Sequence, residues 1–327
     1  MSYTKSVVLP VSPDEAFTLI TDPERLRRWQ TVSAYVDLRT GGEYRWTITP
    51  GQVATGTFKE IEPGRRLVFG WGWEGNPELG PDASTVTVTI EPTSEGTRVT
   101  LEHAGLTDRL ESLHAQGWDH YLGRLEEMAA TGDAGPDDFA WTADVSQPAV
   151  IADAALAAIQ PVLRGLDDDD LDKPTPCADF TCADLVEHLT MSLVRLGAMA
   201  GVTVTEPGQG SIEHRVSTVA APTIDAWRAV DLSGTVPGPG GAELPASFAA
   251  SILPVELILH GWDLARASGQ DLQVRDDVVA CLRELAEVFV PSARTNGSFG
   301  EEVEPAADAN PMDRLAAYAG RRPLVAA

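Results

Sequence analysis

The chain has 327 residues, of which 43% are apolar and 22% are charged, as is typical of soluble globular protein long enough for two domains. Its net charge of −25 is spread over both halves, so we expect no binding to nucleic acid or anionic membranes, because both are polyanions. The sequence has no run of about 18 apolar residues and no N-terminal hydrophobic signal core, and we therefore expect a cytoplasmic protein. Its three cysteines form an odd and sparse set, so we expect reduced thiols that serve mainly in packing.

Up to about residue 135, the sequence predicts mostly strands. An opening strand is followed by a helix start, where Ser12 is the expected N-cap and Pro13 the first helical residue. A second short helix is expected over residues 22–29. Alternating apolar and polar residues then predict strands over residues 33–40, 42–48, 54–62, 65–73, 84–92 and 97–105.

Hairpin turns and a long helix complete this first region. "TGGE" (40–43) and "TSEG" (93–96) supply the turns, and residues 107–132 predict an amphipathic helix. An antiparallel sheet that bends around one long helix buries the apolar faces of both. The expected buried stripe of the helix consists of Leu110, Leu113, Trp118, Leu122 and Leu125.

Two of the predicted strands carry several aromatic residues on one side. In residues 42–48 and 65–73, alternation brings the aromatic side chains of each strand to a common face. They could line a ligand pocket or form an aromatic core, and the sequence leaves both interpretations open. The candidate cavity residues are Tyr44, Trp46, Phe69, Trp71, Trp73 and Trp118.

Three histidines of this region have no acidic or metal-binding partner in the sequence pattern. They are His103, His114 and His120. We expect each of them to have a surface or capping role.

The order of these elements resembles the START-like, or SRPBCC, helix-grip superfamily, and within it the branch named for the activator of heat-shock-protein ATPase. The resemblance covers about residues 3–132 and implies a helix-grip domain over residues 1–135, with a cavity for a small hydrophobic ligand. It does not fix a reaction, because members range from carriers to cyclases. The motifs that carry the resemblance are "SPDEAFTLITDPERLRRW", "GGEYRW", "GTFKEIEPGRRLVFGWGW", "STVTVTIEP", "GTRVTLEHAGL" and "GWDHYLGRLEEM".

A Gly-, Pro- and Asp-rich stretch over residues 129–149 separates this region from a helical one. We place the domain boundary near residues 134–145 and the second domain over residues 145–327. Its first helix, over residues 145–168, is expected to be kinked or interrupted near Pro161.

Further helices follow in the second region. A helix begins at Cys182 with a capping-box-like start at Thr181 and Asp184. Residues 217–231 are less regular, and the Gly/Pro-rich residues 233–246 predict a loop or hairpin. The remaining expected helices cover residues 254–269, 275–290 and 311–323.

The helix over residues 254–269 carries a carboxylate and an imidazole on one face. Glu256 and His260 are four residues apart, and Asp263 follows three residues later. Pro254 is expected in the first turn, where proline is tolerated. By itself, this spacing is common in exposed ion pairs and around hydrogen-bonded core histidines.

His188 adds a second imidazole to this pattern. It is expected on the buried edge of its helix, on the face that carries Leu185 and Leu189. Two histidines and one glutamate make the ligand set of a catalytic zinc site, whose fourth position stays open. A divalent cation would also remove the cost of burying an unpaired carboxylate.

This second region resembles the DinB-like four-helix bundles, and specifically the branch related to mycothiol-dependent maleylpyruvate isomerase. The motifs are "PTPCADFTCADLVEHL", "HGWDLARASG" and "DRLAAYAGRRP", over about residues 146–323. The resemblance implies a divalent metal, zinc in the first place, and mycothiol or another small thiol as cofactor. The isomerase has an additional C-terminal domain, whereas this chain ends soon after "GRRP". The metal ligands that the resemblance implies are His188, Glu256 and His260.

Three other residues of this region have two interpretations each. Asp263 is expected either to orient a ligand histidine as a hydrogen-bond acceptor or to have an N-terminal cap or surface role on the next turn. Arg321 and Arg322 are expected in a solvated tail, with binding of an anionic group of a thiol cofactor as the alternative.

We favour a metal-dependent enzyme, a thiol transferase or isomerase, whose helix-grip domain holds a hydrophobic or electrophilic substrate. Its catalytic residues and oligomeric state are not fixed by the sequence. The alternative is a non-catalytic protein that binds a small hydrophobic ligand or acts in stress response, with a structural metal. In a third interpretation, the helix-grip domain acts on a client protein.

Overall fold

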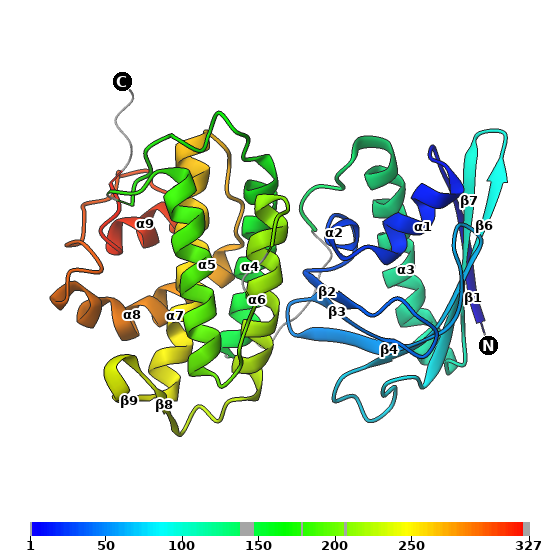
Figure 1. The fold of residues 1–327 in the computed structure, drawn as a ribbon, viewed down its shortest axis with the longest axis horizontal. Coiled ribbons are helices and arrows are strands. Elements are labelled where there is room, and N and C mark those ends of the chain that lie inside the picture. The colour runs from blue at the N-terminus through cyan, green and yellow to red at the C-terminus, as the bar shows by residue number, and fades with distance from the viewer. Residues whose placement is uncertain (1, 138–146, 178, 206–207, 323–327) are drawn as a thin grey trace. The chain divides into compact units, whose positions relative to one another are not determined.

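The computed structural model describes residues 2–137, 147–177, 179–205 and 208–322 (Figure 1). The chain divides into two compact units, Met1–Thr142 and Ala143–Ala327. The expected boundary near residues 134–145 overlaps residues 138–146, which lie outside the described residues.

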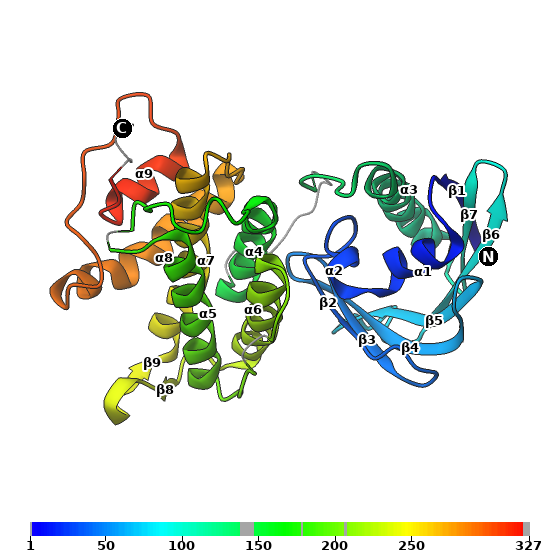
Figure 2. The ribbon, with the colours of Figure 1, turned by 45° about the horizontal axis from the view of Figure 1, so that its top comes forward.

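The N-terminal unit is a seven-stranded antiparallel sheet with one long helix packed against it, as predicted for a helix-grip domain. The strand order is β1-β7-β6-β5-β4-β3-β2, and Figure 2 shows the sheet curving around α3. The elements are β1 (Ser2–Leu9), α1 (Pro13–Thr21), α2 (Pro23–Leu26), β2 (Ser33–Val36), β3 (Glu43–Thr49), β4 (Gln52–Glu62), β5 (Arg66–Trp73), β6 (Ser84–Thr93), β7 (Gly96–Ala104) and α3 (Asp108–Thr131).

Local sequence signals explain where the helices of this unit begin. Ser12 accepts a hydrogen bond from the backbone N–H of Glu15 at 3.2 Å, and Pro13 is the first helical residue of α1, as expected. The helix α2 is shorter than the predicted residues 22–29. Its N-cap, Asp22, accepts from two backbone N–H groups.

The helix α3 buries one face against the sheet. Leu113, predicted to belong to that face, lies outside it. Leu113 is 53% exposed. A step of five residues from Leu113 to Trp118 turns the helix by about 140°, which carries Leu113 away from the apolar stripe. The buried residues of α3 are Leu110, Trp118, Tyr121, Leu122, Leu125 and Met128.

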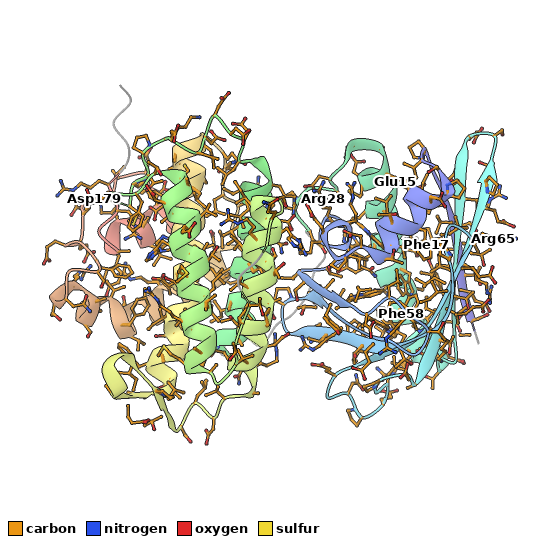
Figure 3. The ribbon with its side chains drawn as sticks, viewed as in Figure 1. Glu15, Phe17, Arg28, Phe58, Arg65 and Asp179 are labelled. Atoms are coloured by element: carbon orange, nitrogen blue, oxygen red, sulfur yellow. The ribbon has the colours of Figure 1, made fainter. Side chains whose placement is uncertain are left out.

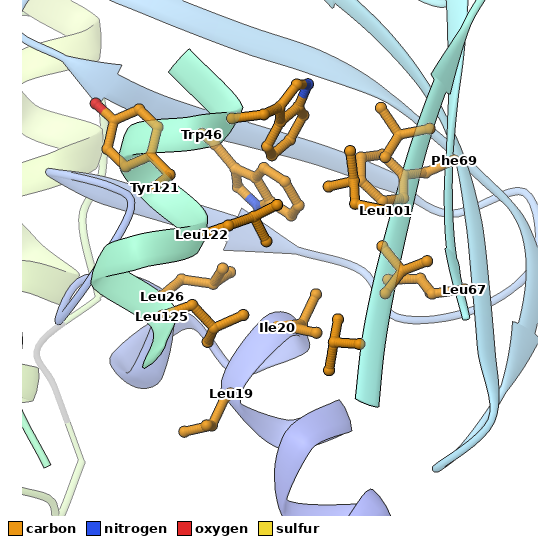
Figure 4. Close-up of a cluster of buried hydrophobic side chains, with 14 of the residues drawn as sticks. Leu19, Ile20, Leu26, Trp46, Leu67, Phe69, Leu101, Tyr121, Leu122 and Leu125 are labelled. Atoms are coloured by element: carbon orange, nitrogen blue, oxygen red, sulfur yellow. The ribbon is translucent and has the colours of Figure 1, made fainter. Parts of the chain in front are cut away.

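The core of this unit lies between α3 and the concave face of the sheet. Figure 4 shows Leu122 and Leu125 of α3 among Trp46, Phe69 and Leu101 of three strands. All five side chains are buried, and burial of each contributes about 1.5–3 kcal/mol. The same core includes residues from α1 and β4, namely Phe17 and Phe58 (Figure 3).

The second unit is helical, with four long helices packed as a bundle. In it α4 contacts α6 and α7, and α5 contacts α6 and α7, as the two ribbon views show (Figures 1 and 2). This agrees with the predicted DinB-like bundle. The elements are α4 (Pro148–Gly165), α5 (Cys182–Met199), α6 (Ile212–Ala229), β8 (Thr235–Pro237), β9 (Glu243–Pro245), α7 (Ala246–Ser268), α8 (Asp276–Thr295) and α9 (Pro311–Tyr318).

Four prolines lie inside helices of this unit, contrary to expectation. One of them is Pro291 in α8, a helix that continues to Thr295 instead of ending at residue 290. Pro161 does not interrupt α4, and residues 217–231, predicted to be irregular, belong mostly to α6, which continues through Pro222. Pro254 lies in the middle of α7, which begins eight residues earlier at Ala246. An internal proline costs about 3 kcal/mol, and the extensive burial of these helices outweighs that cost.

The helix α7 is the most apolar helix of the unit. It is long and apolar enough to cross a membrane, but 83% of its apolar 18-residue segment is buried inside the protein. Such burial is typical of the core helix of a soluble protein.

A glycine brings α7 into close contact with α4. A Cβ atom at Gly261 would lie 2.2 Å from Cγ2 and 2.9 Å from Cβ of Ile159. Both distances are shorter than van der Waals contact, and the β-branched Ile159 side chain is stiff. Only glycine therefore allows this helix spacing.

We expect Gly261→Ala to lower the free energy of unfolding by about 1–3 kcal/mol, since overpacking outweighs alanine's higher helix propensity. The control is Gly123→Ala in α3, where nothing lies within 4 Å of the added methyl group; this change should be neutral or stabilising. Urea unfolding measures both. In an Ile159→Ala background the cost of Gly261→Ala should shrink, and strict additivity of the two changes would contradict the packing argument.

Candidate metal centre and ligand cavity

Residues of α5 and α7 converge in the helical unit. Oε2 of Glu256 lies 3.3 Å from Nε2 of His260 and 3.8 Å from Nε2 of His188. The two imidazole rings are 5.1 Å apart and nearly perpendicular. One ligand atom from each residue lies within 4.8 Å of the others. The structure thus brings the three predicted ligands together.

The cluster has a buried side and an open side. His260 is 3% exposed and the Glu256 side chain is 13% exposed, whereas the His188 side chain is 37% exposed. His188 therefore lies at the margin of the buried face of α5, with its ring toward His260, and not fully inside that face. The buried face of α5 is filled by other residues, which include Leu185, Leu189, Leu193 and Leu196.

The charges of the cluster are coupled. Burial raises the pKa of Glu256, but the two histidines lower it further, so the net shift is downward. Burial lowers the pKa of His260, yet the carboxylates of Glu256 and Asp263 raise it to about 9. Burial and the neighbouring His260 lower the pKa of His188. Without a metal, His260 therefore holds a proton between two carboxylates, and a bound cation would replace that proton.

Asp263 lies on the other side of the His260 ring. It is fully buried, and its Oδ2 is 3.4 Å from Nδ1 of His260 and 3.1 Å from Nε of Arg321. This is the position expected of a carboxylate that orients a ligand histidine.

Arg321 lies in the protein interior, so its assignment to a solvated tail is wrong. It is 7% exposed, and its guanidinium also lies 5.3 Å from the centre of the Phe299 ring. The burial is explained by this aromatic contact and by the ion pair with Asp263. Arg322, in contrast, is exposed.

Cys177 is a site residue that the sequence interpretation missed. It is half-buried, and its sulfur lies within 4.8 Å of ligand atoms of His260 and Asp263. Burial raises the pKa of its thiol to about 11, so it is a weak nucleophile in the metal-free protein. The predicted packing role of Cys177 was based only on the number and spacing of the cysteines in the chain. The motif "PTPC" was the available signal.

The donor set fits a divalent cation of the zinc type. Two imidazoles and a carboxylate are zinc ligands. Among the described residues, Glu256 forms ion pairs only with His188 and His260. A buried carboxylate that depends on two histidines for its charge balance suits cation binding.

The N-terminal unit contains a cavity of about 550 Å³ on one side of α3. Of the six predicted cavity residues, Trp71, Trp73 and Trp118 line it. Trp46 and Phe69 lie with Trp118 around a separate void of about 10 Å³, which has room for one water molecule at most.

Tyr44 lines neither of these two spaces. It is fully buried, and its hydroxyl donates to the backbone oxygen of Gly70 at 2.7 Å. Tyr44, Trp46 and Phe69 thus belong to an aromatic core, whereas Trp71, Trp73 and Trp118 line the cavity.

Residues 10–130 match the family model described as Activator of Hsp90 ATPase homolog 1-like protein, and residues 152–265 match the Mycothiol maleylpyruvate isomerase N-terminal domain. An AHSA1-like protein of Rhizobium etli with a solution structure is 36% identical over 44% of this chain and 90% of that chain, with a TM-score of 0.37. The chain belongs to the Activator of Hsp90 ATPase homolog 1-like family. Its second unit is a domain of the mycothiol maleylpyruvate isomerase N-terminal type.

Other similar proteins match only part of this chain. The uncharacterized protein MT0763 of Mycobacterium tuberculosis is 28% identical over 179 residues, which are 53% of this chain and 97% of that protein. DynU16, from the dynemicin biosynthetic locus, is 26% identical over 41% of this chain, with a TM-score of 0.37. The match covers 48% of DynU16, so this chain spans about half of its length.

Two histidines of the N-terminal unit have other surroundings than expected. His103 is fully buried, accepts from Nε1 of Trp118 at 3.0 Å and donates through Nε2 to Ser84 Oγ at 2.8 Å. His120 lies 2.8 Å from the carboxylate of Asp137. The surface or capping role is therefore wrong for His103, and His120 does have an acidic partner.

His114 lines the cavity of the N-terminal unit, and its imidazole ring is neutral. Its Nε2 accepts from Nε1 of Trp73 at 3.2 Å, and its Nδ1 donates to the backbone oxygen of Leu110 at 2.7 Å. Both nitrogens are thus satisfied without a charge. Burial lowers its pKa, which favours the same neutral form.

His103 makes the stability of this unit depend on pH. Burial, together with the nearby His114, lowers its pKa to about 3, so between pH 6.5 and 3 the unfolded chain binds a proton that the folded chain does not. Stability is therefore lost as the pH falls. We expect His103 to contribute about 2 kcal/mol of destabilisation between pH 7 and pH 5. Urea unfolding of wild type and His103→Gln at both pH values measures it. An identical pH dependence in the two proteins would contradict the assignment.

Proposed function

We propose that the protein is a metal-dependent, thiol-using transferase or isomerase of the cytoplasm, with an added domain that holds a hydrophobic substrate. The observation that carries the proposal is the convergence of His188, Glu256 and His260 around one space. The match to the mycothiol maleylpyruvate isomerase N-terminal domain supports a small thiol, such as mycothiol, as the cofactor.

The proposed roles follow from the geometry. His188, Glu256 and His260 would hold a divalent cation, in the first place zinc, through two imidazoles and one carboxylate. When bound, such a cation lowers the pKa of a coordinated thiol and so supplies a thiolate at neutral pH.

The surrounding residues keep the ligands in position. Asp263 holds the proton of His260 on Nδ1 and thereby turns Nε2 toward Glu256. Arg321 balances the charge of Asp263. The half-exposed His188 leaves an access route for thiol and substrate on the α5 side.

A thiol-transfer assay tests the function. The zinc-loaded protein is incubated with mycothiol and 1-chloro-2,4-dinitrobenzene; a C–S bond forms, the C–Cl bond breaks, chloride leaves, and the thiol proton goes to buffer. We expect a rate above the uncatalysed reaction that depends on both zinc and thiol. Glutathione in place of mycothiol shows whether the thiol is selected. The absence of zinc-dependent turnover across a panel of electrophiles would count against an enzyme.

The cavity favours a second candidate function, which is binding without turnover. In that case the N-terminal unit sequesters a hydrophobic molecule in its space of about 550 Å³, and the metal has a structural role. The fourth coordination position distinguishes the two candidates: an added thiol that changes the spectrum of the cobalt-substituted protein supports an enzyme, whereas an unresponsive spectrum supports a structural site.

A further inference from the structure

The cavity of the N-terminal unit has aromatic walls and no net charge. Trp71, Trp73 and Trp118 form much of its apolar wall, with ring centres of neighbouring tryptophans 5.1–5.5 Å apart. Among the described lining residues, only Glu78 and Arg109 carry full charges. These two side chains pair with each other and are exposed at 47% and 64%. The space therefore suits a neutral compound with a flat aromatic body.

Besides the indole N–H of Trp71, which has no hydrogen-bond partner among the described residues, two buried polar side chains line this space without a protein partner. Gln30 and Thr49 both line the cavity and are 4% and 7% exposed. Their side chains form no hydrogen bond with the rest of the described chain. Their polar atoms are nevertheless not sealed off, so a molecule in the cavity can reach them. Unpaired polar groups in such a location indicate ligand recognition, because leaving them unsatisfied is costly.

Gln30 is held firmly in place. Its backbone N–H donates to the oxygen of Leu26 at 2.9 Å. The preceding residue, Trp29, donates from its indole to the oxygen of Leu19 and accepts from Nε of Arg124, both at 2.9 Å. Gln30 also borders the small inner void beside Trp46 and Phe69. The backbone at Gln30 is therefore fixed, and its side chain lies between the cavity and the aromatic core.

We infer that this cavity binds a neutral aromatic compound whose carbonyl or hydroxyl group hydrogen-bonds to the side-chain amide of Gln30. The inference rests on the proposed ligand-holding role of the N-terminal unit and is independent of the metal centre. The neutral states of His114 and Tyr121, whose pKa values burial shifts away from the charged forms, agree with an uncharged ligand.

The test compares two probes that share one carbon skeleton, 9-fluorenone, which has a carbonyl group, and fluorene, which lacks it. Binding to the full-length protein is measured by quenching of tryptophan fluorescence. We expect the wild type to bind fluorenone about five- to tenfold more tightly than fluorene, as one hydrogen bond allows. In Gln30→Leu, this ratio should fall to about one while fluorene still binds.

The matched control is Gln52→Leu, because Gln52 lines the same cavity but is exposed. It should keep the wild-type ratio. Gln30→Met gives a second measurement if Gln30→Leu does not fold. Equal affinities of the wild type for both probes, or an unchanged ratio in the Gln30 variants, would overturn the inference while leaving hydrophobic binding intact. Failure to bind either probe would overturn both the inference and the proposed ligand-holding role.

Discussion

Replacing His188 by alanine should abolish stable zinc binding. Wild-type protein incubated with zinc and then desalted should retain about one zinc ion per chain, measured by inductively coupled plasma mass spectrometry. The loss of one of three protein ligands is expected to weaken the affinity more than about 100-fold, since even partners of the ligands contribute 10- to 100-fold. Glu256→Gln and His260→Ala should have the same effect.

His188 is the most informative of the three, because its half-exposed side chain can be shortened without opening the core. His214→Ala is the control, since it removes an imidazole from α6 outside both candidate ligand clusters. It should leave the zinc content at the wild-type value. If His188→Ala binds as much zinc as His214→Ala, the metal centre and the proposed function both fail.

Replacing Asp263 by asparagine should destabilise the helical unit by about 3–5 kcal/mol, because it leaves the buried guanidinium of Arg321 without its carboxylate. Urea unfolding in the presence of a chelator separates this effect from any loss of metal. The double variant Asp263→Asn/Arg321→Met should recover much of the stability, since it removes both charges.

The control for this prediction is Asp313→Asn. Asp313 also pairs with an arginine, Arg266, but both side chains are partly exposed, at 29% and 43%. Its replacement should cost no more than about 1 kcal/mol. An equal loss of unfolding free energy in Asp263→Asn and Asp313→Asn would show that burial does not strengthen the contribution of the Asp263–Arg321 pair to stability.

Periodicity predicted most of the N-terminal fold because alternation and capping are local signals. The six strands after α1 lie within a few residues of their expected ranges. Pro254, in contrast, led to a wrong helix start, because proline is usual at helix N-termini and tertiary packing alone allows it inside α7.

The candidate site was predictable only in part. The spacing of Glu256 and His260 places them on one face whatever the tertiary structure. The approach of His188 from α5 depends on helix packing. The helix-face pattern and the family resemblance both selected this residue, but neither is a local signal that fixes the distance between the two helices. The places of Cys177 and Arg321 depend on contacts between a loop, a chain end and α7, for which the sequence carries no periodic signal.

The close contact at Gly261 has a consequence for how the metal centre could open. Glu256, His260 and Asp263 all belong to α7, and the residue directly after His260 is wedged against Ile159 of α4. Sliding or rotating α7 would drive its backbone into that side chain. The α7 side of the candidate centre is therefore held by this contact, so if a thiol enters as proposed, widening of the site requires movement of parts other than α7, such as the α5 side that carries His188.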